Sequence, residues 1–377
     1  MKTSDIVVIG GGIIGCAVAY YLAKEGAQVS LVEKGFLGSS TTATQSNLSL
    51  QARALGPELD LALESMNIYL KLEDELDFVI DYKRTGSCRF TSKKERWESL
   101  KTTAKKQREQ GLKNHLLNKQ QLKEKFKDVI CSKDIIGAVI NDDDAIVNSI
   151  KVNIGYAKAL RRLGAKIYNY TQVTDIKVVK HKVNSVVTSE GNIPTKIVVN
   201  AAGAWSPIIG KMVGINIPIE PQRGHLIVTE QISPVTNTNV FINEADSLVF
   251  PNSNCEISFV FSQTQEGNCL IGSSREFLGY NSNVNFDVVK KINHRALQFM
   301  PIMRDVKCIR TFVGLRPYTS DGLPILSGVE KVEGFFVASG HGSKGIILGP
   351  ASGRFVSKLI CGEGPKQNPF KLSRFCT

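Results

Sequence analysis

The pattern of apolar residues predicts an α/β region at the start of the chain and a β-rich region in its middle. A β-branched run, Ile6–Ile9, is followed by a helical pattern over residues 16–24 and by a second apolar run, Val29–Val32. Unbroken apolar runs of this length are typical of strands that are buried on both faces. Residues 217–275 instead contain short apolar runs between Asn, Gly, Pro and Ser, which is typical of strands joined by turns. We therefore expect two sheets of different kinds.

The same pattern predicts the remaining elements. Helices are expected over residues 59–76, 92–111, 118–126, 148–163, 288–300 and 346–360, and strands over residues 79–90, 135–140, 165–168, 172–177, 184–188, 196–200 and 334–338. Residues 35–50 are rich in small hydroxyl residues and are expected to form a loop. Because an α/β pattern returns near the end of the chain, the first sheet is expected to draw on non-contiguous segments.

The composition shows that the chain as a whole is basic. The net charge is +12 and the pI is near 9.2, with much of the excess between residues 83 and 127. The basic helix over residues 92–111 is read either as a solvated face or as a docking face for an acidic partner subunit. Basic residues are not interleaved with aromatic ones as in nucleic-acid modules, so we expect no nucleic-acid partner. Glycines interrupt the first apolar run, which argues against a transmembrane span or a signal peptide there.

The cysteine pattern argues against two kinds of structure. Eight cysteines are scattered along the chain without a C-x-x-C pair. This argues against a metal site and against a disulfide framework. Reduced thiols without an export signal indicate a cytoplasmic protein. Any association with a membrane would then go through a partner.

A glycine motif lies directly after the first predicted strand. Gly10, Gly12 and Gly15 follow the order G-x-G-x-x-G, and Glu33 ends the second strand. The first glycine permits a tight turn, the second lets a pyrophosphate approach the backbone, and the third allows close helix–strand packing. The helix N-terminus offers N–H groups to phosphates, and the downstream acid accepts hydrogen bonds from a ribose. We interpret residues 5–34 as an adenine-dinucleotide site; the alternative is an ordinary glycine-rich turn.

A second glycine motif stands near the end of the chain. Gly340, Gly342 and Gly345 follow a predicted strand and open a predicted helix in the segment SGHGSKGI. No further strand with an acidic residue follows, so we interpret this segment as a second helix N-terminus directed at the same ligand. Its dipole would favour negative charge on a reduced cofactor ring. FAD, whose ring lies far from its adenine, fits two such helix starts better than a nicotinamide cofactor does.

Six motifs in order resemble the D-amino-acid-oxidase family of flavoproteins. They are GGGIIG with Glu33, VVNAAGAW at 198–205, PQRGHL at 221–226, LIGSSRE at 270–276, GLRPYTSDGLP at 314–324 and SGHGSKGI at 339–346. The resemblance covers essentially the whole chain. It is strongest to glycine oxidase, to sarcosine oxidase β subunits and to the FAD subunits of proline and hydroxyproline dehydrogenases.

The resemblance implies a mixed fold, α/β combined with α+β. A Rossmann-like FAD-binding domain would be assembled from residues 1–80, 145–215 and 310–377. A β-rich substrate domain, with an antiparallel or mixed sheet, would be formed by residues 81–144 and 216–309. Partner subunits, and either oxygen or a partner as the electron acceptor, are further possibilities that this family leaves open.

Specific cofactor contacts are also implied by the resemblance, and no covalent attachment is expected. The FAD-binding residues would be Gly10, Gly12, Ile13, Ile14 and Gly15 at the pyrophosphate, Glu33 and Lys34 at the ribose, Ser40, Thr41 and Thr42 on the phosphates, Ser46, Asn47 and Leu48 beside the isoalloxazine, Val173 at the adenine, Ala202, Gly203, Trp205 and Gly314 elsewhere along the cofactor, and His341, Gly342, Ser343, Lys344, Gly345 and Ile346 under the pyrimidine end of the ring.

For the substrate, the resemblance points to Arg316, because the arginine of the family's G-L-R-P motif binds the substrate carboxylate. A planar guanidinium forms two parallel charge-assisted bonds with a carboxylate, a geometry that lysine cannot copy. Three positions depart from glycine oxidases. Ser343 replaces a second arginine, Arg275 replaces a neutral residue, and a tyrosine is missing near residues 248–250. We name Arg316, Lys344 and Arg275 as catalytic residues and expect a larger amino or imino acid than glycine, with Lys344 contacting flavin or substrate.

The implied reaction is oxidation of the Cα–N bond of a small amino or imino acid, of the D-amino acid, proline, hydroxyproline, sarcosine or glycine type. Hydride would pass to flavin N5 and leave an imine, without a protein base. Alternatives are a 2-hydroxy acid dehydrogenase of the same fold, which needs a base near the hydroxyl group, and an FAD-carrying electron-transfer subunit. A third is a non-enzymatic NAD-binding module.

Overall fold

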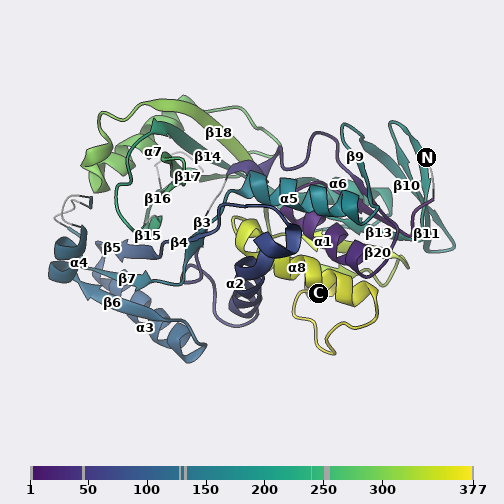
Figure 1. Cartoon of the computed structure of the whole chain (residues 1–377), viewed down its shortest axis with the longest axis horizontal. Coiled ribbons are helices and arrows are strands. Elements are labelled where there is room, and N and C mark those ends of the chain that lie inside the picture. Colours follow the sequence, from purple (N-terminus) through teal and green to yellow (C-terminus); the bar gives the residue numbers. More distant parts are fainter. Residues whose placement is uncertain are drawn as a thin grey trace.

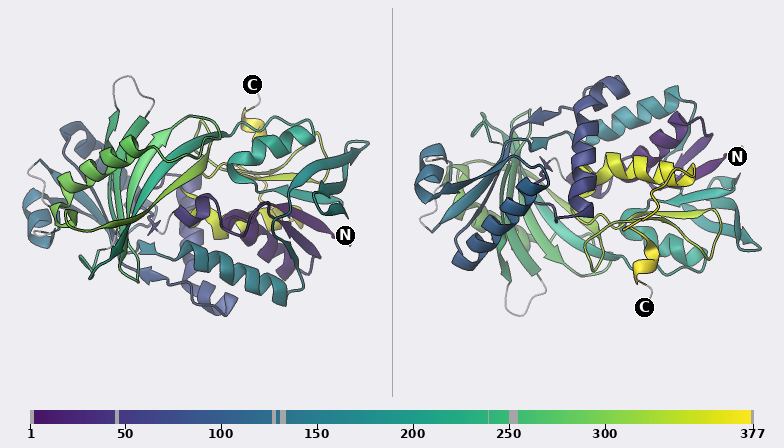
Figure 2. Two further views of the ribbon diagram at one scale, coloured as in Figure 1. Left: turned by 90° about the horizontal axis from the view of Figure 1, so that it is seen from above. Right: turned by 90° about the horizontal axis from the view of Figure 1, so that it is seen from below.

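The chain forms two lobes that lie side by side along the long axis of the molecule, each built around its own sheet (Figure 1 and Figure 2). The structure is a computed structural model, and it describes residues 3–44, 47–126, 129–130, 134–238, 240–249 and 255–375. In both figures the first helix of the chain, in purple, runs beside the last, in yellow. The two ends of the sequence therefore contribute to the same lobe.

Helices are distributed over both lobes. They are α1 (Ile13–Lys24), α2 (Pro57–Leu76), α3 (Lys94–Glu109), α4 (Lys119–Phe126), α5 (Ser149–Arg162), α6 (Ser206–Met212), α7 (Phe286–Phe299) and α8 (Gly345–Ile360), with 3-10 turns η1 (Thr41–Thr44), η2 (Gly203–Trp205), η3 (Pro301–Met303) and η4 (Leu372–Phe375).

Six strands form the sheet of the first lobe. They are β1 (Ile6–Ile9), β2 (Val29–Val32), β9 (Lys166–Tyr168), β13 (Ile197–Asn200), β19 (Ile325–Gly328) and β20 (Phe335–Ser339), in the spatial order β19-β20-β13-β1-β2-β9. All neighbours are parallel except β19, which pairs antiparallel with β20. The order of strands reverses at β1, which lies between β2 and β13. In such sheets ligands bind at the carboxyl ends of the strands beside this reversal.

The alternating side chains of β1 enter two different cores. Ile6 and Val8 pack with apolar residues of α1, α2, α5 and α8. Val7 and Ile9 pack on the other face with α6 and with the small sheet of β10 (Val173–Val179), β11 (Lys182–Thr188) and β12 (Gly191–Pro194). Helices α1 and α8 approach closely because Gly353 has no Cβ, which would lie 2.6 Å from Ala17. This contact joins the beginning of the chain to its end.

The second lobe contains an eight-stranded mixed sheet. Its strands are β18 (Cys308–Tyr318), β14 (Glu220–Gln231), β17 (Asn268–Glu276), β16 (Cys255–Gln263), β15 (Val240–Val249), β5 (Ser87–Thr91), β7 (Gly137–Asn141) and β6 (Asn114–Asn118), in that spatial order. Every neighbouring pair is antiparallel except β15 and β5. A short sheet of β3 (Asn47–Leu48), β8 (Ala145–Ile146) and β4 (Lys83–Arg84) accompanies the two large ones.

Residues of this large sheet alternate between a core and a cavity. On β16, Phe259 and Phe261 pack against the apolar face of α7, while Val260 and Ser262 border a cavity on the opposite side. Successive side chains of a strand point to opposite faces, so one strand serves both purposes. One face of the sheet therefore packs in the core and the other borders a cavity.

The predicted fold class is confirmed: a mostly parallel sheet and a mixed sheet stand side by side, and α1, α3 and α4 lie close to their expected positions. Two expectations were wrong. The strand expected over residues 79–90 is divided into β4 and β5, because Gly86 lies between them with φ +67°. The strands over residues 217–275 are long rather than short, since polar residues such as Ser258 and Ser262 occupy positions inside β16. The boundaries of the two domains stay predictions.

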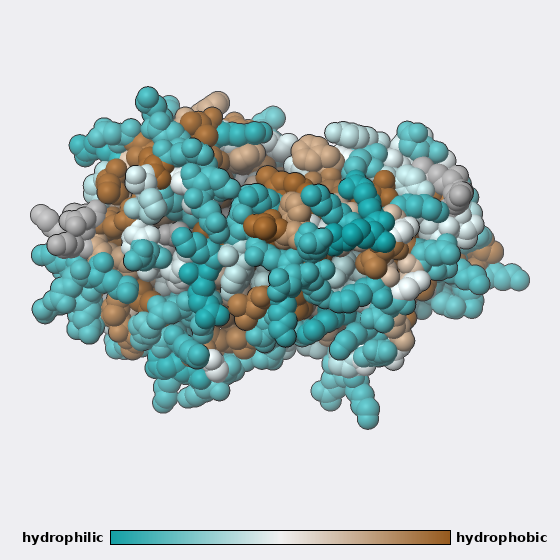
Figure 3. Space-filling model, viewed as in Figure 1, coloured by the Kyte–Doolittle hydropathy of each residue, from teal (hydrophilic) through white to brown (hydrophobic). Residues whose placement is uncertain are grey.

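Hydrophilic side chains dominate the face shown in Figure 3, including the region over α3, and apolar side chains appear between them in separate patches. Within the described ranges, no helix combines the length and the apolar character that crossing a bilayer requires.

Candidate functional site

A long cavity opens at the carboxyl ends of β1 and β2, where the strand order reverses. We call it the glycine cavity. Its lining includes Gly10, Gly12, Ile13, Ile14, Glu33, Lys34, Ser40, Thr41, Thr42, Val173, Ala202, Gly203, Trp205, His341, Gly342, Gly345 and Ile346. The structure thus brings most of the predicted cofactor residues together around one cavity. Their contacts with a cofactor stay predictions.

The three glycines of the first motif occupy three different environments. Gly10 has φ +108°, and a Cβ there would lie 2.4 Å from the carbonyl oxygen of Ala201. A Cβ on Gly15 would lie 1.8 Å from the carbonyl oxygen of Gly10. A Cβ on Gly12 would meet only Thr42 Oγ1, at 3.3 Å, and Gly12 borders the cavity. The first and third glycines are therefore required by packing, whereas the second keeps space open for a ligand.

Glu33 holds the loop that follows β2. Its Oε2 accepts a hydrogen bond from the Gly11 N–H at 2.7 Å, and its Oε1 accepts one from the Gly35 N–H at 2.8 Å. Beside it, the Lys34 ammonium lies 3.6 Å from the centre of the Trp205 ring. Burial lowers the pKa of Lys34, and the neighbouring Glu33 opposes that shift. Trp205 is half-buried and lines the cavity, so it is part of the wall rather than of the core.

Two helix N-termini border the glycine cavity. The N-cap of α1 is Gly12, which has no side chain to cap the helix, and the Ile13 N–H donates to Thr42 Oγ1 at 3.1 Å. The N-cap of α8 is Lys344, whose side chain does not cap the helix either. First-turn N–H groups of a helix have no intrahelical acceptor and carry a positive partial charge. Both ends are therefore suited to a negatively charged ligand.

His341 stands in the wall of this cavity as a buried, neutral side chain. Its Nε2 is 2.9 Å from Ser352 Oγ on α8. Burial lowers the pKa of His341 to about 3, and Lys344 adds to the shift. The imidazole therefore fixes the loop against α8 and is uncharged near neutral pH.

A second cavity lies under the large sheet. We call it the arginine cavity. It is lined by Thr41, Thr44, Asn47, Ser49, Ala52, Arg53, Gly224, His225, Leu226, Ile242, Val260, Ser262, Leu270, Gly272, Ser273, Arg275, Arg316 and Ser343. Thr41 lines both cavities, and Pro317, the residue after Arg316, lines the glycine cavity. The two cavities therefore meet beside Arg316.

Arg316 is held on strand β18 by neighbouring backbone. Its Nη1 donates a hydrogen bond to the Ser274 carbonyl at 2.8 Å. Its guanidinium lies against Gly224 on β14, where a Cβ would come within 2.2 Å of Nη2. The glycine of the PQRGHL motif therefore makes room for the arginine of the GLRP motif. Any larger residue at position 224 would displace the guanidinium.

His225 is the one imidazole among the described residues that line the arginine cavity, and both of its nitrogens are engaged. Nε2 accepts a hydrogen bond from the Asn285 N–H at 3.0 Å, and Nδ1 lies 2.9 Å from Ser274 Oγ. Burial lowers the pKa of His225 to about 4, although Glu276 opposes the shift. Glu276 itself is bonded by Arg223 through Nε at 3.1 Å and Nη2 at 3.0 Å. This imidazole is therefore a structural group.

Arg275 also lines the arginine cavity. Its Nη1 donates to Ser258 Oγ at 3.2 Å and lies 3.5 Å from Glu256 Oε1 on the adjacent strand. Asn47 and Ser343 share the same cavity. The structure thus places two of the three residues named for catalysis, Arg316 and Arg275, around one space.

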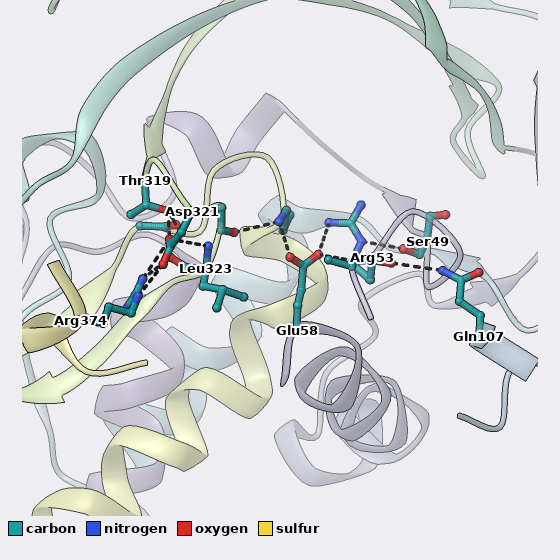
Figure 4. Close-up of polar contacts among 12 residues, drawn as sticks. Ser49, Arg53, Glu58, Gln107, Thr319, Asp321, Leu323 and Arg374 are labelled. Atoms are coloured by element: carbon teal, nitrogen blue, oxygen red, sulfur yellow. Dashed lines mark hydrogen bonds and ion pairs between the residues drawn. The ribbon is translucent and has the colours of Figure 1, made fainter. Parts of the chain in front are cut away.

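Lys344 is placed differently from the expectation. Its ammonium forms a hydrogen-bonded ion pair with Glu58, the buried carboxylate at the start of α2, and donates to the Gly322 carbonyl at 2.9 Å. Figure 4 shows Glu58 at the centre of this polar chain. Lys344 lines neither cavity. These bonds give it the geometry of a structural ion pair beside the site.

Three other predicted residues lie behind the cavity walls. Gly15 packs against Gly10, Leu48 is completely buried in the apolar core, and Gly314 lies against Thr41 and Thr44. They shape the site without lining it. Ser46, predicted beside the flavin ring, lies outside the described residues.

The sequence reasoning missed several residues of the cavity walls. Thr171 and Gln172 precede the predicted adenine contact Val173 and line the glycine cavity with it. Arg53 and His225 line the arginine cavity. Because Gln172 directly precedes Val173, the sequence could have indicated that Gln172 lines the same cavity. Nothing in the local sequence distinguishes Arg53 from a solvated arginine, because its burial depends on α2 and on the large sheet.

The residues of the glycine cavity fit a dinucleotide. Gly12 leaves the position of a Cβ open, two helix N-termini provide N–H groups, and the Thr42 hydroxyl, which accepts from the Ile13 N–H, keeps its own proton to donate. A pyrophosphate needs such donors and close approach to the backbone. The adjoining arginine cavity offers guanidinium groups, which are suited to bind an anion.

The comparisons with known proteins agree with this geometry. Residues 5–359 match the DAO family model, described as FAD dependent oxidoreductase. Glycine oxidase of Geobacillus kaustophilus is 28% identical over 378 residues, covering 98% of this chain and 96% of that protein. Sarcosine oxidase subunit beta of Rhodobacter capsulatus is 25% identical over 382 residues, covering 99% and 89%. The crystal structure of L-proline dehydrogenase from P. horikoshii matches with TM-score 0.90 and 26% identity, covering 99% and 98%. The chain therefore belongs to the DAO family of FAD-dependent oxidoreductases.

Proposed function

We propose that this chain binds FAD non-covalently in the glycine cavity and oxidises the Cα–N bond of an amino or imino acid held in the arginine cavity. The observation that carries this proposal is the position of Arg316, which lines the arginine cavity while the next residue, Pro317, lines the glycine cavity. A carboxylate bound by Arg316 would keep its Cα at the junction of the two spaces. Binding in this way supplies orientation and proximity, which contribute much of the rate enhancement in such reactions.

Bound FAD supplies the acceptor for the two electrons that leave the substrate. The N-terminus of α8 would favour negative charge at the adjoining end of the glycine cavity. The lining of both cavities contains no cysteine among the described residues, so we do not propose attachment of the flavin through a thiol.

The composition of the arginine cavity favours an amine over a 2-hydroxy acid as the donor. A hydroxy acid needs a base for its hydroxyl proton, whereas an amine in its neutral form needs none. Among the described lining residues there is no Asp, Glu, Lys or Tyr, and His225 is engaged through both nitrogens. The remaining side chains can bind and orient the substrate but are poorly suited to take up a proton.

The test is an anaerobic reduction screen of the purified protein. Its visible spectrum should show bound flavin, which heat denaturation should release into solution. We expect an amino or imino acid from a panel of sarcosine, glycine, D- and L-proline and other D- and L-amino acids to bleach the flavin. Bleaching by 2-hydroxyglutarate alone would contradict the proposal, and so would a protein that carries no flavin.

The electron acceptor is part of the same proposal. We propose a dehydrogenase that passes electrons to a partner, with the basic face of α3 as the docking surface. After reduction by the best amine, reoxidation should be faster with an artificial dye than with air-saturated buffer. Faster reoxidation by oxygen, with release of hydrogen peroxide, would instead identify an oxidase.

A further inference from the structure

Arg53 brings an additional positive charge to the arginine cavity. Its side chain is 9% exposed, and Arg53 lines the cavity together with Arg275 and Arg316. The three arginines come from the segment before α2, from β17 and from β18. Among the described lining residues there is no acidic side chain. Three guanidinium groups are more than one α-carboxylate requires.

The hydrogen bonding of Arg53 is incomplete. Its Nε donates to the Ser49 carbonyl at 3.0 Å, and its Nη1 lies 3.9 Å from Glu58 Oε1, beyond hydrogen-bond distance. Nη1 is buried without a hydrogen-bond acceptor in the described part of the chain. In Figure 4 one nitrogen of the Arg53 guanidinium faces Glu58, a second faces Ser49, and the third points away from both. Nη1 therefore faces Glu58, and the nitrogen directed away from Glu58 and Ser49 is the one placed to bond an anionic group of a ligand.

Two buried carboxylates, Glu58 and Asp144, lie near Arg53. Glu58 is shared between Arg53 and Lys344. Asp144 is also close enough to influence this region, but its oxygens accept bonds from Ser49 Oγ, Ser87 Oγ and the Leu50 N–H. Two carboxylates thus stand against two cations here, and Glu58 is closer to Lys344 than to Arg53.

The segment that carries Arg53 is held in place by hydrogen bonds. Glu58 is completely buried and also accepts a hydrogen bond from the Ala54 N–H at 3.1 Å. Gln107 of α3 donates through Nε2 to the carbonyls of Gln51 and Arg53, at 3.1 and 3.2 Å. The segment that carries Arg53 is thus held from α2 and from α3. Rigid support of this kind is what a binding group needs.

From these contacts we propose that Arg53 binds a second acidic group of the substrate, so that the substrate is a dicarboxylic amino or imino acid. Arg316 would bind the α-carboxylate and Arg53 the distal one. This inference rests on the proposed amine oxidation and names its substrate class. It also gives a reason for a cavity that three arginines line and to which no acidic side chain of the described residues contributes.

The experiment compares acids with their amides, which are nearly equal in shape and differ in charge. Anaerobic flavin reduction is measured with D- and L-glutamate against D- and L-glutamine, and with D- and L-aspartate against the asparagines. We expect kcat/KM for the reactive acid to exceed that for its amide by about tenfold or more, because a charge-assisted bond is lost in the amide. In Arg53→Gln this ratio should fall to within about threefold of one, whereas Arg53→Lys should keep part of it. Arg161→Gln, an equal change at an exposed position of α5, is the control and should keep the whole ratio.

A second readout does not require turnover. The thermal unfolding midpoint of the flavin-loaded protein is measured with succinate and with its monoamide succinamate. Succinate should stabilise more strongly, and Arg53→Gln should remove the difference. If Arg53→Gln does not fold, the acid-to-amide ratio of the unmodified protein and of Arg53→Lys still decides the question.

The outcomes separate this inference from the proposed function. If neutral amino acids reduce the flavin as fast as acidic ones, or if Arg53→Gln keeps the ratio, the assignment of Arg53 is wrong and amine oxidation stands. If no amine reduces the flavin but succinate binds through Arg53, the second anion site stands and amine oxidation fails.

Discussion

The two cavities of this protein are built by opposite means. The glycine cavity is bordered by two helix N-termini and by Gly10 and Gly12, which carry no Cβ, and Gly15 lets the turn behind its wall close. The arginine cavity is formed by side chains that the large sheet and the segment before α2 present, with Arg53, Arg275 and Arg316 among them. One cavity depends on where Cβ atoms are missing, the other on where charges are placed.

This difference indicates which residues of the site can be substituted without disturbing the fold. A backbone cradle is set by local geometry, and a substitution there disturbs the fold itself. Side chains on strands can be substituted while the hydrogen bonds between the strands stay intact, because the side chains stand perpendicular to the sheet. We therefore expect substitutions in the glycine cavity to change folding and cofactor content, and those in the arginine cavity to change substrate use.

The largest effect is expected for Gly15→Ala. The added Cβ would lie 1.8 Å from the Gly10 carbonyl oxygen, so the turn between β1 and α1 must move. Overpacking against backbone should cost about 3 kcal/mol or more in the free energy of unfolding, with loss of flavin. Urea unfolding measures the free energy of unfolding, and the visible spectrum measures the flavin content.

Gly12→Ala is the matched comparison, because its Cβ would meet only Thr42 Oγ1, at 3.3 Å. Its free energy of unfolding should stay unchanged while its affinity for flavin falls. Equal stability of the two variants would refute the distinct roles.

Arg316→Lys should act on substrate alone. Lysine keeps the charge but cannot make two parallel bonds to a carboxylate, so kcat/KM should fall about 10- to 100-fold. Flavin content and the unfolding midpoint should stay close to those of the unmodified protein. Steady-state kinetics with the best amine provide the measurement. Arg310→Lys, on the same strand but exposed, is the control. A loss of flavin in Arg316→Lys would show that the two cavities are not separable in this way.

Glu33→Gln should weaken the cofactor without abolishing folding. Gln has one acceptor oxygen where Glu33 accepts from both Gly11 and Gly35, so one buried N–H loses its partner. A lost hydrogen bond to a charged group should raise the dissociation constant of FAD about tenfold. Titration of the flavin-free protein by fluorescence quenching measures it. Glu25→Gln, an exposed carboxylate after α1, should behave like the unmodified protein. Unchanged affinity in Glu33→Gln would remove Glu33 from the cofactor site.

The smallest effect concerns pH, because each cavity contains one buried histidine. The pKa of His225 is lowered to about 4 and that of His341 to about 3, both through burial, from 6.5. The unfolded chain therefore binds these protons first, and stability falls as pH decreases from about 6.5 toward 4. Burial raises the pKa of Asp144 from 3.8 to about 6, so this group opposes the fall between those values.

Asp144→Asn separates these contributions. It removes the opposing group, so stability should fall more steeply on acidification, by up to about 1.4 kcal/mol more per pH unit near pH 5. Urea unfolding of both proteins at pH 7, 6 and 5 gives the slopes. Parallel slopes would mean that Asp144 does not carry a raised pKa.

Spacing along the chain by itself determined the glycine cavity. The positions of Gly10, Gly12, Gly15 and Glu33 follow from the geometry of one βαβ unit, in which the backbone fixes what lies opposite what. The second helix start, at Gly345, could be predicted from the sequence for the same reason. Local geometry needs only neighbouring residues, so a pattern of about thirty positions carries it.

Only the tertiary structure decided the charge pattern of the arginine cavity. Lys344 looked like a cavity residue in its loop, yet it binds Glu58, which is 286 residues away in sequence. No local pattern marks Arg53 as buried, yet it pairs with Glu58 of α2 and lines a cavity with residues of the large sheet. Which side chains meet across such distances depends on how two lobes pack, and no periodicity along the chain encodes that. The sequence thus specifies where a dinucleotide can lie, and the packing of the lobes specifies which charges surround the neighbouring cavity.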